Sequence, residues 1–264
     1  NCGIAEPNMI TFACGLAKEN FLPICYTITN FLIYKTYEQI RNDAIYNNNK
    51  IILVGTGSGF SYSHLGPTHH SLEDIGLLNN LPNIRIFSPA DNNDLDEHLK
   101  FSLNTKNKET TYIRLGKKNE PIINKAKLKI NKINFVKKNN SKIALIFTGP
   151  LSEVVNNAYE KLRQKNLNID IINFHQIKPL SPKMIKDLEK YRFIFTLEEH
   201  FSQTGIKSII SSNLSDKKTK IISLNNKNKF ISQLGSRNYV RKNFGISSNN
   251  IFKFIENAKY QGRN

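Results

Sequence analysis

The chain has 264 residues, 39% of them hydrophobic, which is enough to bury one large core or two of ordinary size. Its formal net charge is +17, but the basic residues are spread along the chain and form no basic helix, so we expect no nucleic-acid partner. No apolar run reaches the roughly 20 residues that span a bilayer, and Cys2, Cys14 and Cys25 lack metal-ligand spacing, which together indicate a cytoplasmic protein with reduced thiols and no membrane partner.

The first half of the chain alternates short apolar runs with amphipathic segments. Such runs are typical of buried strands, and the segments between them are typical of helices. We expect strands at residues 22–28, 51–55, 84–88 and 111–115, and helices at residues 7–17, 31–46 and 93–103. This alternation predicts an α/β domain with a mainly parallel sheet.

A break rich in Lys and Asn follows, and a second pattern of the same kind begins after it. The second pattern predicts strands at residues 143–147, 169–174 and 193–197, and helices at residues 153–165 and 184–191. We therefore expect two doubly wound α/β domains with mainly parallel sheets. The predicted boundaries are residues 1–118 for the first domain, 119–141 for a linker and 142–264 for the second domain.

Three segments contain residues that could carry chemistry. Glu6 precedes a helix that opens with Pro7, where a carboxylate often serves only as a cap. Gly-Thr-Gly-Ser-Gly at residues 55–59 follows a strand end, where open α/β sheets place ligand sites. Gly-Pro-Thr-His-His at residues 66–70 offers two neutral imidazoles, which suit a polar substrate better than a metal because no further ligand is suitably spaced.

Together, these segments resemble the transketolase family. The resemblance runs through Gly-Ile-Ala-Glu-Pro-Asn-Met at residues 3–9, the segment 65–75 around the histidine pair, Ser-Pro-Ala-Asp at residues 88–91, Ile-Lys-Pro-Leu at 177–180 and Leu-Glu-Glu-His at 197–200. It covers nearly the whole chain and extends to 1-deoxyxylulose-5-phosphate synthases. The resemblance implies a pyrimidine-binding domain of the thiamine-diphosphate-binding fold, followed by a transketolase C-terminal domain.

The resemblance gives Glu6 a catalytic and cofactor-binding role. In this family a buried glutamate hydrogen-bonds N1′ of the aminopyrimidine ring of thiamine diphosphate and favours the imino tautomer that activates the cofactor. The pKa of such a carboxyl group is expected to be raised by burial. By position, Phe31 is the expected stacking residue for the ring, and Ile28 and Tyr26 are expected to support it.

The resemblance also assigns substrate-binding residues. His69 is expected to contact the donor hydroxyl or the reacting oxygen and is the second catalytic candidate. His70 and His64 are expected to line the entrance of the same substrate site. Arg114, or Lys117 three residues later, is expected to bind the sugar phosphate, to which an arginine can donate two hydrogen bonds.

No Gly-Asp-Gly motif with a downstream Asn occurs in the sequence, so no segment is expected to bind the diphosphate and its Mg²⁺. We therefore expect a partner domain or subunit that supplies this half, in a homodimer or heterotetramer, and no turnover by this chain alone. Leu65 stands where many transketolases have an aspartate that contacts a donor-sugar hydroxyl, which leaves the donor open.

The leading hypothesis is a transketolase-type subunit that moves a two-carbon ketol unit between phosphorylated sugars. The enzymatic alternatives are a 1-deoxyxylulose-5-phosphate synthase, which joins pyruvate to glyceraldehyde phosphate, and the β subunit of a 2-oxo-acid dehydrogenase. A non-catalytic partner subunit is a further alternative, and a basic nucleic-acid-binding module is the weakest one.

Overall fold

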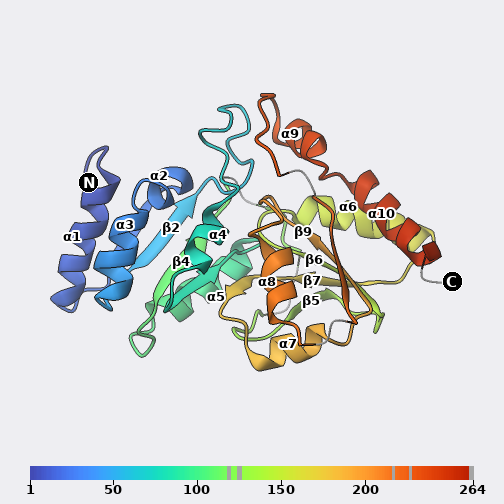
Figure 1. The fold of residues 1–264 in the computed structure, drawn as a ribbon, viewed down its shortest axis with the longest axis horizontal. Coiled ribbons are helices and arrows are strands. Elements are labelled where there is room, and N and C mark those ends of the chain that lie inside the picture. Colours follow the sequence, from blue (N-terminus) through green and yellow to red (C-terminus); the bar gives the residue numbers. More distant parts are fainter. Residues whose placement is uncertain (118–119, 124–126, 216–217, 226–227, 262–264) are drawn as a thin grey trace.

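The computed structural model describes residues 1–117, 120–123, 127–215, 218–225 and 228–261. Two α/β units lie side by side, and each is built around a five-stranded sheet with helices packed on it (Figure 1). Strands that follow one another through a helix run parallel in both sheets, as expected for a chain that alternates strands and helices. The predicted fold class, α/β with two mainly parallel sheets, is confirmed.

The first sheet has the strand order β1-β2-β4-β3-β8. Its four leading strands are parallel and follow the predicted apolar runs, and β8 joins the edge antiparallel to β3. The strands are β1 (Ile24–Ile28), β2 (Ile52–Thr56), β3 (Ile84–Phe87), β4 (Thr110–Arg114) and β8 (Gln176–Lys178). The helices of this unit are α1 (Glu6–Lys18), α2 (Thr29–Ile33), α3 (Tyr37–Gln39), η1 (Ile40–Tyr46), α4 (Asp74–Asn79) and α5 (Asn92–Leu103).

The predicted single helix at residues 31–46 is wrong. The structure divides this stretch into α2, a turn, the short α3 and the π-helix η1. The hydroxyl of Thr36 donates to the carbonyl of Leu32, and such local hydrogen bonds compete with regular helix geometry. Phe31 therefore lies in α2, and Lys35 lies in the turn that follows it.

The second sheet has the strand order β10-β9-β6-β7-β5, with β5 antiparallel to β7 at one edge. The sequence prediction missed the short strands β8 and β10 and the last three helices. The strands are β5 (Asn134–Lys137), β6 (Ile143–Phe147), β7 (Asp170–Asn173), β9 (Phe193–Leu197) and β10 (Lys220–Ser223). The helices are α6 (Ser152–Gln164), α7 (Pro182–Leu188), α8 (Ile206–Asn213), α9 (Arg237–Phe244) and α10 (Ser248–Gln261).

The two units are joined by shared structure as well as by the chain between them. Strand β8 comes after β7 in the chain but pairs with β3 of the first sheet. The amide of Ser88 donates to the carbonyl of His175 at 2.8 Å and extends this junction. Strand β5 lies inside the predicted linker and pairs with the second sheet, and the predicted boundary at residues 118 and 119 lies outside the described residues.

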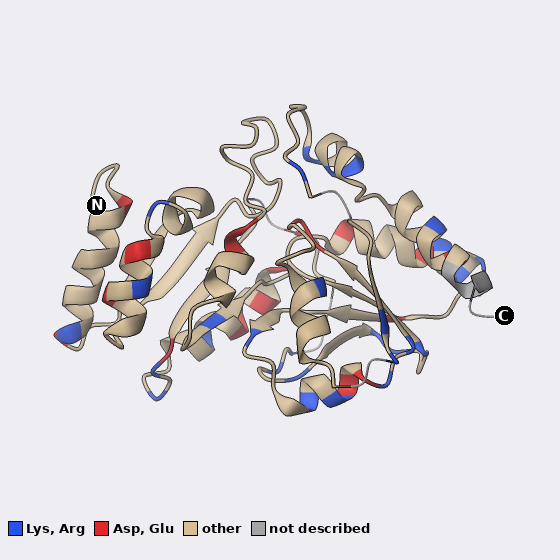
Figure 2. Ribbon diagram, in the orientation of Figure 1, with Lys and Arg blue, Asp and Glu red and all other residues tan. Residues whose placement is uncertain are grey.

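One apolar core runs through both units. Ile75 and Leu78 of α4 belong to the same cluster of buried side chains as Ile206 and Ile210 of α8. Basic and acidic residues lie on both units, so the net charge is not gathered on one helix (Figure 2). Among the described residues, no helix is long and apolar enough to cross a membrane.

Candidate functional site

Glu6 lies in the first turn of α1, where Pro7 follows it, and the residue is only 8% exposed. Its carboxylate accepts a hydrogen bond from Lys35 Nζ at 2.7 Å. This hydrogen bond, helped by the backbone N–H at the helix start, outweighs desolvation and lowers the pKa of Glu6 below its usual value. The raised pKa expected for this carboxyl group is therefore wrong for the chain on its own, since the sequence prediction did not include Lys35.

A row of side chains leads from Glu6 to the histidine pair. Lys35 Nζ lies 6.0 Å from the centroid of the Phe31 ring, and the Phe31 ring meets the His69 ring edge-on at 5.5 Å between centroids. His69 Nδ1 is 3.0 Å from the hydroxyl of Thr68, which orients the imidazole. The structure thus brings together Glu6, Phe31 and His69, which the sequence prediction named from segments far apart.

Tyr62 and Lys117 continue this row beyond His69. The Tyr62 ring centroid is 6.1 Å from that of His69, and Lys117 Nζ lies 4.6 Å from the Tyr62 centroid. Gly57 makes room for the ring, because a Cβ on this glycine would lie 2.1 Å from a Tyr62 carbon. The glycine-rich loop at residues 55–59 therefore serves close packing here, and the exposed Lys117 is the cation near this end of the row.

A hollow of about 510 Å³ lies beside Glu6, between α1 and the edge strand β1. Cys25 and Tyr26 line it together with Glu6. Tyr26 is 62% exposed, so its ring is available to a ligand or a partner, and Ile28 is half-buried at the end of β1. Tyr26 and Ile28 thus lie on the edge strand β1, and Phe31 lies in α2, which follows it, against His69.

The two other predicted histidines lie differently. His64 is exposed on the loop that follows Tyr62. His70 is 2% exposed, packs edge-on against Phe60 at 5.1 Å, and has no hydrogen-bond partner for either ring nitrogen among the described residues. Burial lowers the pKa of His70, so its imidazole is neutral at physiological pH.

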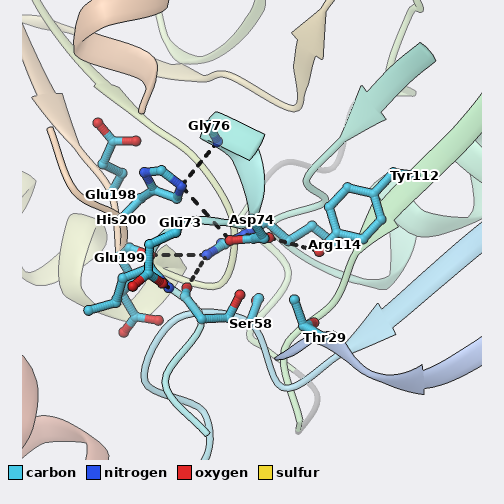
Figure 3. A network of polar contacts seen from close by, with 12 residues as sticks. Thr29, Ser58, Glu73, Asp74, Gly76, Tyr112, Arg114, Glu198, Glu199 and His200 are labelled. Atoms are coloured by element: carbon cyan, nitrogen blue, oxygen red, sulfur yellow. Dashed lines mark hydrogen bonds and ion pairs between the residues drawn. The ribbon is translucent and has the colours of Figure 1, made fainter. Parts of the chain in front are cut away.

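Arg114 is buried at the end of β4, with 1% exposure (Figure 3). Its guanidinium donates to Asp74 at 2.7 Å and to the carbonyls of Ser71 and Glu199 at 3.0 Å each. The hydroxyl of Tyr112 also donates to Asp74, at 2.7 Å. Because these contacts hold the guanidinium inside the protein, we do not retain Arg114 as a phosphate-binding residue; Lys117 is the exposed alternative.

Glu199 connects the two units through the same network. It accepts hydrogen bonds from Arg241, from Arg237 Nη2 at 3.0 Å and from the amide of Phe60 at 3.2 Å. Burial raises the pKa of Glu199, but the two arginines outweigh it and lower the pKa to about 2. The segment 197–200 was quoted only for its family resemblance, and pairing with Arg237 and Arg241 could not be read from spacing.

His200 lies beside Asp74 in this network, but it is not a charged partner. Burial lowers the pKa of His200 to about 4. Its Nε2 accepts a hydrogen bond from the amide of Gly76 at 3.4 Å, and its Nδ1 lies 3.0 Å from the carbonyl of Phe201. The imidazole is therefore neutral with its proton on Nδ1, and Arg114 is the cation that compensates Asp74.

The donor set near Glu6 fits an aminopyrimidine ring. A carboxylate can hydrogen-bond a ring nitrogen, Tyr26 lines the same hollow as Glu6, and the Phe31 ring lies near Lys35, the hydrogen-bond partner of Glu6. Among the described residues, no group of three or more His, Cys, Asp or Glu side chains could hold a metal.

Two family models match the chain. The model of the transketolase pyrimidine-binding domain matches residues 1–121, and that of the transketolase C-terminal domain matches residues 131–251. One of the subunits of the apulose-4-phosphate transketolase of Actinobacillus succinogenes is 29% identical over 95% of this chain and 81% of its own length. Human transketolase is 30% identical over 80% of this chain and 34% of its own.

Similarity extends to a second enzyme and to solved structures. The 1-deoxy-D-xylulose-5-phosphate synthase of Caldanaerobacter subterraneus is 30% identical over 94% of this chain and 40% of its own length. A split-gene transketolase solved as an inactive β4 tetramer superposes with a TM-score of 0.84 at 21% identity, over 98% of this chain and 82% of that one. At this low sequence identity, the superposition supports a shared fold and nothing further.

Proposed function

Since the chain belongs to the transketolase family, we propose that it is the pyrimidine-binding and C-terminal part of a thiamine-diphosphate-dependent enzyme that transfers a two-carbon ketol unit between phosphorylated sugars. The observation that carries the proposal is the position of Glu6. Its carboxylate lies at a helix start beside a hollow, with Tyr26 lining that hollow and Phe31 close by. A carboxylate with only a capping role would not need the row of rings that leads from it.

The residues of this chain would have separate roles in binding the cofactor and the substrate. When bound, thiamine diphosphate supplies the carbanion chemistry. Glu6 would hold a proton at N1′ of the ring and thereby fix its tautomer, and Phe31 and Tyr26 would orient the ring by packing. His69 would hydrogen-bond the donor hydroxyl or the reacting oxygen, and Lys117 would pair with the sugar phosphate at the far end of the row.

A second domain or subunit would complete the site. It would bind the diphosphate and Mg²⁺, for which the described residues offer no ligand cluster. One comparison supports a separate partner, because a relative is itself named as a single subunit of a transketolase. We propose a dimer or heterotetramer in the cytoplasm, without turnover by this chain alone.

The test of the proposed function is the variant Glu6→Gln in the enzyme assembled with its diphosphate-binding partner. Gln keeps the size of the side chain but cannot exchange a proton, so kcat should fall by about 10²–10⁴-fold, as for the loss of a general acid-base group. Glu19→Gln is the matched control, since Glu19 is exposed at the other end of α1. Full turnover by Glu6→Gln would refute the proposal.

A 1-deoxyxylulose-5-phosphate synthase is the second candidate, favoured by relatives of that name that cover almost the whole chain. The two activities differ in the donor, which is pyruvate for the synthase and a ketose phosphate for the transketolase. Initial rates of the assembled enzyme with each donor, at equal concentrations of glyceraldehyde 3-phosphate and ribose 5-phosphate as acceptors, decide between them.

A further inference from the structure

Lys35 contacts the carboxylate from which the proposed function starts. Its ammonium donates to Glu6 Oε2 at 2.7 Å, and its side chain is 47% exposed whereas that of Glu6 is 10% exposed. The lysine therefore covers the carboxylate from the solvent side. It comes from the turn after α2, four residues beyond Phe31, so the contact is made across elements and not within one helix.

The same ammonium lies near both groups that a pyrimidine ring would contact. Lys35 Nζ is 6.0 Å from the centroid of Phe31 and within hydrogen-bond distance of Glu6. A ring that stacks on Phe31 and shares a proton with Glu6 would come up against this ammonium. The ammonium already donates a charge-assisted hydrogen bond, which is the stronger kind, to one of the two carboxylate oxygens, Oε2.

We propose that Lys35 is a positioning residue that holds the Glu6 carboxylate in the cofactor-free chain and is displaced from it when the aminopyrimidine ring binds. This inference rests on the proposed function, because the ring is what displaces the lysine. The half-exposed stem of Lys35 allows the displacement, since a long side chain at the surface changes rotamer without repacking the core. Glu6 is thereby kept ionised and oriented while no cofactor is present.

The first test uses the chain by itself and needs no activity. The side-chain carboxyl carbon of Glu6 is titrated by NMR in the wild type and in Lys35→Met. The titration midpoint should rise by about 0.2–0.7 pH unit in Lys35→Met, which is the size of a partly exposed ion pair. Lys18→Met, which removes the same charge from the last turn of α1, should leave the midpoint unchanged. An equal midpoint in Lys35→Met and wild type overturns the proposal.

The second test measures the dissociation constant of thiamine diphosphate with Mg²⁺ by equilibrium dialysis, on the enzyme assembled with its diphosphate-binding partner. Lys35→Met should bind about two- to fivefold more tightly than wild type, because the ring no longer competes with the ammonium. An unchanged or weaker affinity overturns the proposal, since Lys35 would then not obstruct the ring. The two failures are distinguishable: full turnover by Glu6→Gln ends the proposed function, while the Glu6 midpoint of the chain alone still reports on the ion pair.

Discussion

Replacing Arg114 by Met should lower the free energy of unfolding strongly, and its main effect should be on stability and not on substrate binding. Arg114 is 1% exposed, and Asp74, its partner at 2.7 Å, is fully buried. Removing one partner of such a pair leaves an uncompensated buried charge and costs about 3–5 kcal/mol. The carbonyls of Ser71 and Glu199 lose their donor in the same variant.

This loss should be visible in both thermal and urea unfolding. For a chain of this size, 1 kcal/mol corresponds to about 2–4 °C, so Tm should fall by about 6–20 °C. The double variant Arg114→Met with Asp74→Asn serves as the control, because it removes both charges. It should be more stable than the sum of the two single effects by about 0.5–3 kcal/mol.

Two results would refute this reasoning. If the free energy of unfolding fell by less than about 1 kcal/mol in Arg114→Met, Arg114 would not be the group that compensates the buried charge of Asp74. Full stability combined with a raised KM for the phosphorylated substrate would return Arg114 to the phosphate-binding role first expected from its position at the end of β4.

Two further predictions concern Glu198 and Lys117. Burial raises the pKa of Glu198 to about 8, against 4.5 for an ordinary glutamate, so its contribution to stability is present below about pH 4.5 and is lost as the pH rises through 8. Urea unfolding between about pH 5 and about pH 9 should therefore show a smaller decline in Glu198→Gln than in wild type, and parallel curves would contradict the assignment. Lys117→Met should raise the KM for the phosphorylated donor about five- to tenfold with little change in kcat, since an exposed cation contributes about 1 kcal/mol to phosphate binding. Steady-state kinetics check this against Lys106→Met, which removes an exposed lysine elsewhere, and a fall in kcat at constant KM would contradict it.

The inner strands of both sheets could be predicted from sequence because they are largely buried on both faces and read as continuous apolar runs. Ile52 to Val54 and Ile143 to Phe147 are examples, and the structure places both in interior strands of their sheets. Strand β8 could not be predicted, because three residues carry no period and its partner β3 lies about 90 residues earlier.

The site was predictable where a single motif contains the functional residue, and less so where tertiary contacts decide. Glu6 and His69 stand in motifs, and the structure brings both into one row through Phe31. Lys35 was missed because its contact with Glu6 joins two elements that lie 29 residues apart in the sequence. Arg114 reads as a strand-end cation, and only the fold reveals that Asp74 meets it inside the protein.

Strand β8 has a practical consequence for the choice of truncation points in this protein. It is contributed by the second unit but completes the edge of the first, next to β3. A truncation after the first unit would bare the backbone of β3 and part of the common core, and a bare strand edge invites association with other chains. Shortened versions of this protein should therefore not end between the two units, whatever boundary the motifs suggest.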